Sequence, residues 1–195
     1  MASKGKKLSL YSLSRENVTS DPDEFNAYKR VIFGEGQSHR SVALMAAAFV
    51  EHALLELIKT KLIILNEEEG NALFFDKGAT LGTFADRIDI ACAMGLISKD
   101  QQFHLNIIRR IRNVFAHAIK DIHFDHQLIL QECRKFNLLR IGSIDTRIES
   151  DDAPKEHYTN VCHLLAIDFK QRTDIARKIG PNRRATSDDD SAQSP

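Results

Sequence analysis

The stretch Leu105–His117, LNIIRRIRNVFAH, decides how the rest of this sequence is interpreted. It places three arginines, two asparagines and a histidine in a run otherwise made of Leu, Ile, Val, Phe and Ala. A buried charge that lacks its partner costs roughly 3–5 kcal/mol, so arginines in an apolar helix need counter-ions or access to water. These polar groups therefore either hold the fold together or form a functional site.

The composition favours a single helical domain. A chain of 195 residues is long enough for one domain with a substantial core. Apolar residues make up 43% and charged residues 28%, which is the balance of a soluble globular protein. Glycine and proline are sparse, at 9 and 4, which favours long helices with few turns. The predicted fold class is all-α, a single compact antiparallel helical domain with a peripheral C-terminal helix.

Helix caps and apolar spacing divide the chain into segments. Asp21 and Pro22 form a helix start, Ser98 with Gln101 forms a capping box that opens the helix containing the motif, and Pro154 marks another helix start. We expect a flexible arm at 1–20, a helical core at 21–140, a linker at 141–154, a C-terminal helix at 155–179 and a disordered tail at 180–195. Within the core we expect helices at about 21–33, 38–65, 67–75, 80–95, 98–117 and 125–136.

Charge and cysteine content narrow the function class and the compartment. The formal net charge is zero and the pI is about 7.1, whereas a protein that grips DNA or RNA usually carries a basic excess. Nucleic-acid binding is therefore only weakly supported. The three cysteines lie far apart in the sequence, as in a reduced cytoplasmic protein. The first residues, MASKGKK, lack the apolar segment of a signal peptide, so we expect a cytoplasmic protein.

Membrane, metal and cofactor binding are not expected. The longest apolar run is interrupted by Glu51 and His52, short of the ~18–20 residues that a membrane span needs. His123 and His126, with Cys133 nearby, are spaced H-x-x-H but lack a third ligand at a fixed spacing. We therefore predict no metal site and no cofactor.

One acidic residue stands in the middle of the longest apolar helix. Glu51 falls within Val42–Ile58, which is apolar almost all round and so predicts burial on several sides. A buried glutamate needs a cation, a set of hydrogen bonds or a raised pKa, and we expect Arg109 or Arg112 of the motif to supply the cation, with Arg109 preferred. The predicted structural polar network consists of Glu51, Arg87 and Arg109. We also expect Arg87 to form a charge set with the neighbouring Asp86 and Asp89. We expect Arg110 to reach solvent.

Two segments resemble the core signature of the mannitol operon repressor family. A TF-x-x-RI segment leads to GLI and then to the helix IR-x-IRN-x-FAH, and Val42–Ile58 is similar to that family's long first core helix, so the resemblance covers roughly 38–136. It implies an all-α, non-enzymatic transcriptional regulator or co-repressor that acts through a protein partner more than through DNA. The matched residues are Phe84, Arg87, Ile88, Gly95, Leu96, Ile97, Ile108, Arg109, Ile111, Arg112, Asn113, Phe115, Ala116 and His117.

A second resemblance overlaps the first and leaves an enzymatic alternative open. The run RNVFAH resembles the R-x4-H motif of HEPN-type ribonucleases, which are small helical proteins that dimerise around it. It implies that His117 acts as general acid or base, that Arg112 stabilises phosphate charge and that Asn113 orients one of them, without a metal. Arg112 and His117 lie ~140° apart around an ideal helix, so they do not share one face. A buried polar network is the competing interpretation, and we prefer it.

The sequence thus predicts a homodimeric regulator with a protein partner. A HEPN-like ribonuclease that uses Arg112, Asn113 and His117 is the alternative. A third possibility is an antitoxin or phage accessory protein that keeps the fold without activity.

Overall fold

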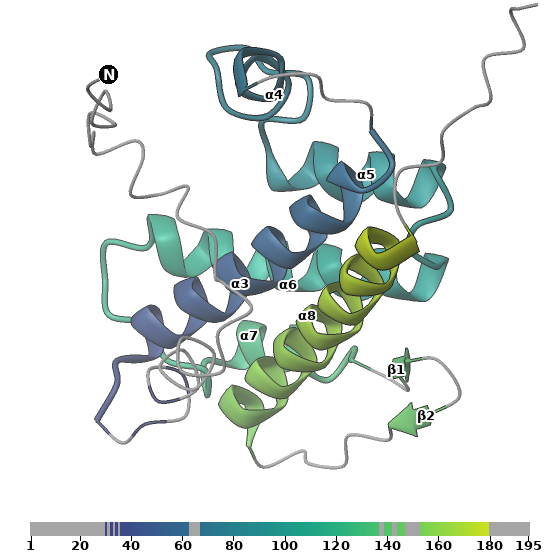
Figure 1. The fold of residues 1–195 in the computed structure, drawn as a ribbon. Coiled ribbons are helices and arrows are strands. Elements are labelled where there is room, and N and C mark those ends of the chain that lie inside the picture. Colours follow the sequence, from purple (N-terminus) through teal and green to yellow (C-terminus); the bar gives the residue numbers. More distant parts are fainter. Residues whose placement is uncertain are drawn as a thin grey trace, which may run out of the picture.

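The computed structural model describes residues 36–62, 67–136, 139–141, 144–146 and 153–179, together with Arg30, Ile32 and Gly34. The predicted arm, the predicted tail and almost all of the predicted first helix lie outside these residues. The described part is helical apart from one small hairpin, which confirms the all-α prediction (Figure 1). Its elements are α3 His39–Lys59, α4 Glu67–Phe74, α5 Phe84–Ala93, α6 Lys99–His117, α7 Gln127–Cys133, β1 Leu139–Ile141, β2 Ile144–Thr146 and α8 Pro154–Ile179.

Helix α3 is the central element of the core. It begins as predicted at Ser38, whose side chain accepts a hydrogen bond from the Ser41 backbone NH. It ends at Lys59, earlier than the predicted 65, because the chain turns at Thr60, whose backbone NH bonds to the Ile58 and Leu57 carbonyls. By length and composition α3 could cross a membrane, but 61% of its most apolar window is buried inside the fold. This burial is the pattern of a core helix.

Capping boxes start the next two long helices. At α6 the predicted Ser98–Gln101 box is present. At α5 the cap is Thr83, not a residue near 80, and Asp86 completes the box. Asp86 therefore caps its own helix, and the predicted charge set with Arg87 does not form around it.

Helix α8 differs from the prediction that it is peripheral. It lies along α3 (Figure 1), and its residues Tyr158, Leu165 and Phe169 are fully buried. The Tyr158 hydroxyl donates to the Ala43 carbonyl of α3 at 3.1 Å. Because α3 is apolar on several sides, it needs a second long helix to cover it, and α8 does so.

The segment predicted as a linker contains regular structure. Strands β1 and β2 pair antiparallel, with residue 139 opposite 146 and residue 141 opposite 144. This hairpin leads from the end of α7 toward α8, which begins at the predicted Pro154. The prediction missed the strands because three residues each are too few for an alternating pattern.

Candidate functional site

A buried ion pair joins Glu51 of α3 to Arg87 of α5. Nη1 of Arg87 lies 2.9 Å from Oε1 of Glu51, and Arg87 is only 6% exposed. Its Nε donates to the Leu81 carbonyl at 2.9 Å, and its Nη2 donates to the Phe74 carbonyl at 3.1 Å. Arg87 therefore fastens α3, α5 and the chain after α4 together, as a planar guanidinium with several donors can.

The second cation near Glu51 is Arg112 of α6. Its Nη2 lies 3.7 Å from Oε2 of Glu51, and its Nη1 donates to Oδ1 of Asn113 at 3.1 Å. Burial raises the pKa of the Glu51 carboxyl, and the charges of Arg87 and Arg112 oppose that rise. Glu51 thus connects three helices through its two carboxylate oxygens.

Arg109 does not pair with Glu51, which corrects the prediction. Its Nε donates instead to Oδ1 of Asn106, one turn earlier on the same helix, at 3.3 Å. The physical reason is competition, because Arg87 and Arg112 already occupy the two oxygens of Glu51. In the predicted network, Glu51 and Arg87 are brought together and Arg109 is not.

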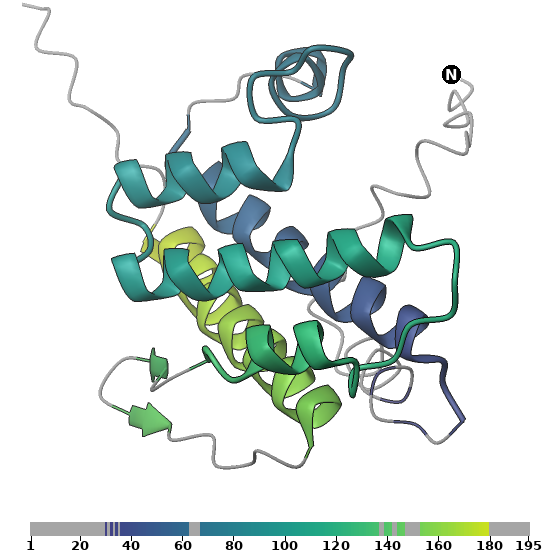
Figure 2. The same cartoon turned by 180° about the vertical axis from the view of Figure 1, so that it is seen from behind.

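The other side of α6 faces outward. Arg110 forms an ion pair with Glu132 of α7 at 2.8 Å, and the predicted exposure of Arg110 is confirmed by its 46% exposed side chain. Val114 and His117 are also exposed. Figure 2 shows α6 between α5 and α7 with no described element over its outer side. The motif therefore has an inner side at Glu51 and an open outer side.

The three residues of the ribonuclease alternative are split between these sides. Arg112 turns inward to Glu51, whereas His117 is the exposed last residue of α6. Asn113 is half-buried and bonds to Arg112. The helix ends at His117 because Ala118 adopts an extended backbone, with φ −66° and ψ 126°.

Two residues that sequence reasoning passed over stabilise the chain beyond α6. Nη2 of Arg40 donates to the carbonyls of Ala118 and Lys120, at 2.6 and 3.2 Å. The Phe124 backbone NH donates to Nδ1 of His39 at 2.8 Å. Burial, followed by the charge of His123, lowers the pKa of His39, so the imidazole stays neutral and accepts this bond. These contacts join positions about 80 residues apart, so no local sequence signal could reveal them.

The histidines of the H-x-x-H spacing have other partners. Nε2 of His123 lies 3.2 Å from Oδ2 of Asp121, and the ring of His123 is 4.6 Å from that of His39. His126 caps α7 through its side chain. Among the described residues, no group of three His, Cys, Asp or Glu side chains is placed to hold a metal ion.

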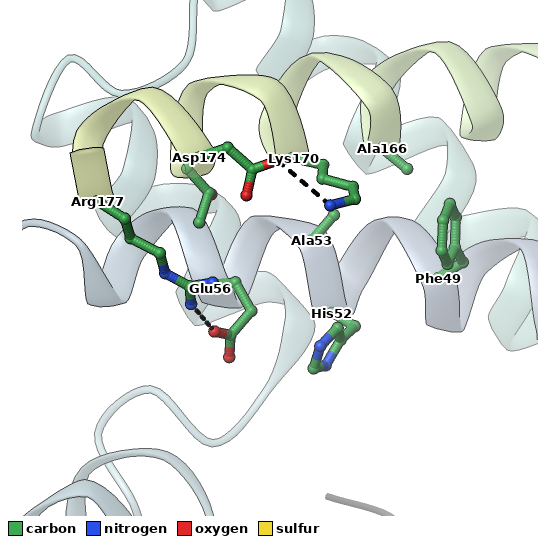
Figure 3. A pocket seen from close by; sticks show the side chains of 9 residues that line it. Phe49, His52, Ala53, Glu56, Ala166, Lys170, Asp174 and Arg177 are labelled. Carbon is green, nitrogen blue, oxygen red and sulfur yellow. Dashed lines mark hydrogen bonds and ion pairs between the residues drawn. The ribbon is translucent and has the colours of Figure 1, made fainter. Parts of the chain in front are cut away.

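A small charged cleft lies between α3 and α8 (Figure 3). Arg177 binds Glu56 at 2.6 Å, and Lys170 binds Asp174 at 3.3 Å. Burial lowers the pKa of the His52 imidazole, which faces this cleft. Burial also acts to raise the pKa of Glu56, but the Lys59 hydrogen bond and the surrounding cations outweigh it and hold that pKa low. The cleft offers about 60 Å³, and its charges already neutralise one another in pairs.

The fold described above is that of an all-helical protein. No protein-family model matches the sequence, and no curated protein matches it. The resemblance to the mannitol operon repressor family therefore stays a prediction. Among solved structures, the chain is similar to one in the X-ray structure of the MtlR–HPr complex from Escherichia coli. The two chains share 15% identity with a TM-score of 0.48, over 78% of this chain and 96% of that one.

Proposed function

We propose that this protein is a non-enzymatic regulator of the mannitol-repressor type, cytoplasmic, which controls transcription by binding a protein partner. The observation that carries the proposal is the division of the motif helix. Its inner arginine is engaged by Glu51, and its outer side, with Arg110 and Val114, is open to a partner. A rigid helix with exposed apolar and arginine side chains is the usual basis of a protein interface.

The buried network supports a scaffold role for the inner side. Arg87 donates hydrogen bonds to three carbonyls in addition to its ion pair with Glu51, so a structural role accounts for its contacts without a catalytic one. Structural ion-pair networks perturb pKa values as active sites do, so the raised pKa of Glu51 is accounted for by burial beside its partners. The zero net charge of the chain agrees with a regulator that binds protein more than DNA.

Binding of HPr is the direct test, because HPr is the protein named in the complex that the chain resembles. Titration calorimetry of the full chain with HPr from the same organism is expected to show saturable one-to-one binding. Deletion of the gene is expected to change the transcript of a sugar-alcohol operon. A chain that binds no HPr and whose deletion leaves all such transcripts unchanged would contradict the proposal.

A metal-independent ribonuclease is the second candidate. The observation that favours it is the exposure of His117 one turn after Asn113, which itself contacts Arg112. The test is incubation of the full chain with total RNA in the presence of a chelator. Cleavage that disappears in a folded His117→Ala variant would establish the enzyme, and a wild-type chain without cleavage would exclude it.

A homodimer stays a prediction for this chain. Sedimentation equilibrium of the full chain over a range of concentrations tests it. A single species at the 22.1 kDa mass of one chain would contradict it.

A further inference from the structure

A groove runs between the outer side of α6 and α7. Its volume is about 450 Å³, compared with about 60 Å³ for the cleft between α3 and α8. Its wall carries five aliphatic residues, and Arg110, Glu132, His126 and Gln131 stand around it. The aliphatic residues are Ile111, Val114, Ile122, Leu128 and Ile129.

Large apolar side chains project into solvent at this groove. Val114 is 45% exposed and Leu128 66% exposed, and Ile119, two residues after the end of α6, is fully exposed. Helix α7 explains why, since it has only seven residues and buries only Ile129 and Cys133. Burial of apolar surface is favourable by roughly 25 cal/mol per Å², so a partner that covers these side chains gains binding energy. Clustered exposure of this kind marks an interaction site.

The segment 109–135, which forms both sides of the groove, carries an excess of positive charge, although the whole chain is neutral. It contains six lysines and arginines and three aspartates and glutamates; because Arg112 is paired with Glu51 on the inner side of α6, an excess of two positive charges remains. Glu132, the acid at the groove, is already bound by both Arg110 and Lys135. Segment 109–135 therefore favours an occupant that brings negative charge.

We propose that the α6–α7 groove binds an amphipathic helix of a partner protein, with apolar residues on one face and an excess of Asp and Glu beside them. The proposal rests on the proposed function, in that it gives the protein partner a docking surface. An aliphatic wall fits an apolar helix face spaced i, i+3, i+4 and i+7 better than it fits a phosphate backbone. A second copy fits less well, because a two-fold contact would bring two basic edges together.

The test uses the full chain and a displayed library of helical peptides about 18 residues, or five turns, long. Peptides selected on the wild-type chain are expected to carry the i, i+3, i+4, i+7 apolar spacing and a net negative charge. Leu128→Glu is expected to weaken the best peptide at least ~10-fold in fluorescence polarisation, because the new charge enters the apolar wall. Arg110→Glu is expected to weaken it and to flatten the salt dependence of binding.

The matched control is Ile175→Glu, which places the same charge at a residue of α8 that is 57% exposed. It is expected to leave the peptide affinity unchanged. Circular dichroism and urea unfolding confirm that each variant is folded.

Selected peptides without an acidic excess, no enriched peptide, or equal binding by Leu128→Glu and wild type would overturn the proposal. So would a dimer that Leu128→Glu dissociates, because the groove would then belong to a second copy. Binding of HPr is measured in a separate titration. A chain that binds acidic peptides but not HPr would therefore contradict only the assignment of HPr as the partner.

Discussion

Two arginine–glutamate pairs at nearly the same distance have different roles in this molecule. Arg87 and Glu51 are 2.9 Å apart with side chains 8% and 17% exposed, whereas Arg110 and Glu132 are 2.8 Å apart with side chains 46% and 27% exposed. The first pair is also bonded to backbone carbonyls, and the second is open to water. Distance alone therefore does not indicate strength. The surroundings decide whether an ion pair holds the fold or remains available to a partner.

The largest expected effect is that of Arg87→Ala. It leaves the Glu51 carboxylate with Arg112 alone and removes the donors to the Leu81 and Phe74 carbonyls. We expect the free energy of unfolding to fall by about 3–5 kcal/mol, as measured by urea denaturation. Arg87→Lys is expected to recover little of this, because one ammonium cannot serve acceptors on three sides. A loss below ~1 kcal/mol would show that the buried pair does not hold the fold.

Arg112→Ala should have an intermediate effect. Its contact with Glu51 is longer, at 3.7 Å, and its side chain is 38% exposed, so solvent screens much of the attraction. We expect a loss of about 1 kcal/mol in the same urea experiment. A loss equal to that of Arg87→Ala would mean that the three-helix network acts as one unit, which the double variant would reveal by non-additivity.

The pH dependence should separate two glutamates of α3. The pKa of Glu51 is raised above its ordinary value of 4.5, so the stability linked to its proton is present below 4.5 and is lost as pH rises through the folded pKa. The pKa of Glu56 is lowered, so its contribution is present above 4.5 and is lost as pH falls through the folded pKa. Unfolding free energies from acid to neutral pH test both signs. Glu51→Gln should remove the loss of unfolding free energy above pH 4.5. Glu56→Gln should remove the loss of unfolding free energy at acid pH.

Arg110→Ala should have the smallest effect. Because the pair with Glu132 is solvent-exposed, we expect a change in unfolding free energy of about 0–1 kcal/mol. A double-mutant cycle with Glu132→Ala measures the coupling directly. A coupling above ~2 kcal/mol would contradict the distinction between the two pairs.

Local signals in the sequence predicted the helix starts well and the long-range contacts poorly. The capping box of Ser98 with Gln101 and the proline at position 154 are short-range signals. Both helix starts that they predict are present in the structure. The acids that flank Arg87 predict a charge set, but Asp86 serves as a cap, and Arg87 turns inward to Glu51, 36 positions away, with which it shares the predicted network. Which of several arginines reaches Glu51 depends on helix packing, and periodicity does not specify packing.

The contact of Tyr158 with Ala43 has a consequence for synthesis of the chain. These partners are separated by 115 positions, so α3 leaves the ribosome long before the helix that covers it. At ~5–20 residues per second, this delay is on the order of 5–20 s. During that interval α3 lacks the cover that α8 provides, and its most apolar 18-residue window has a mean hydropathy of 1.7, which is high enough for a membrane span. We expect nascent chains that end before Pro154 to require a holding chaperone, and completion of α8 to release them.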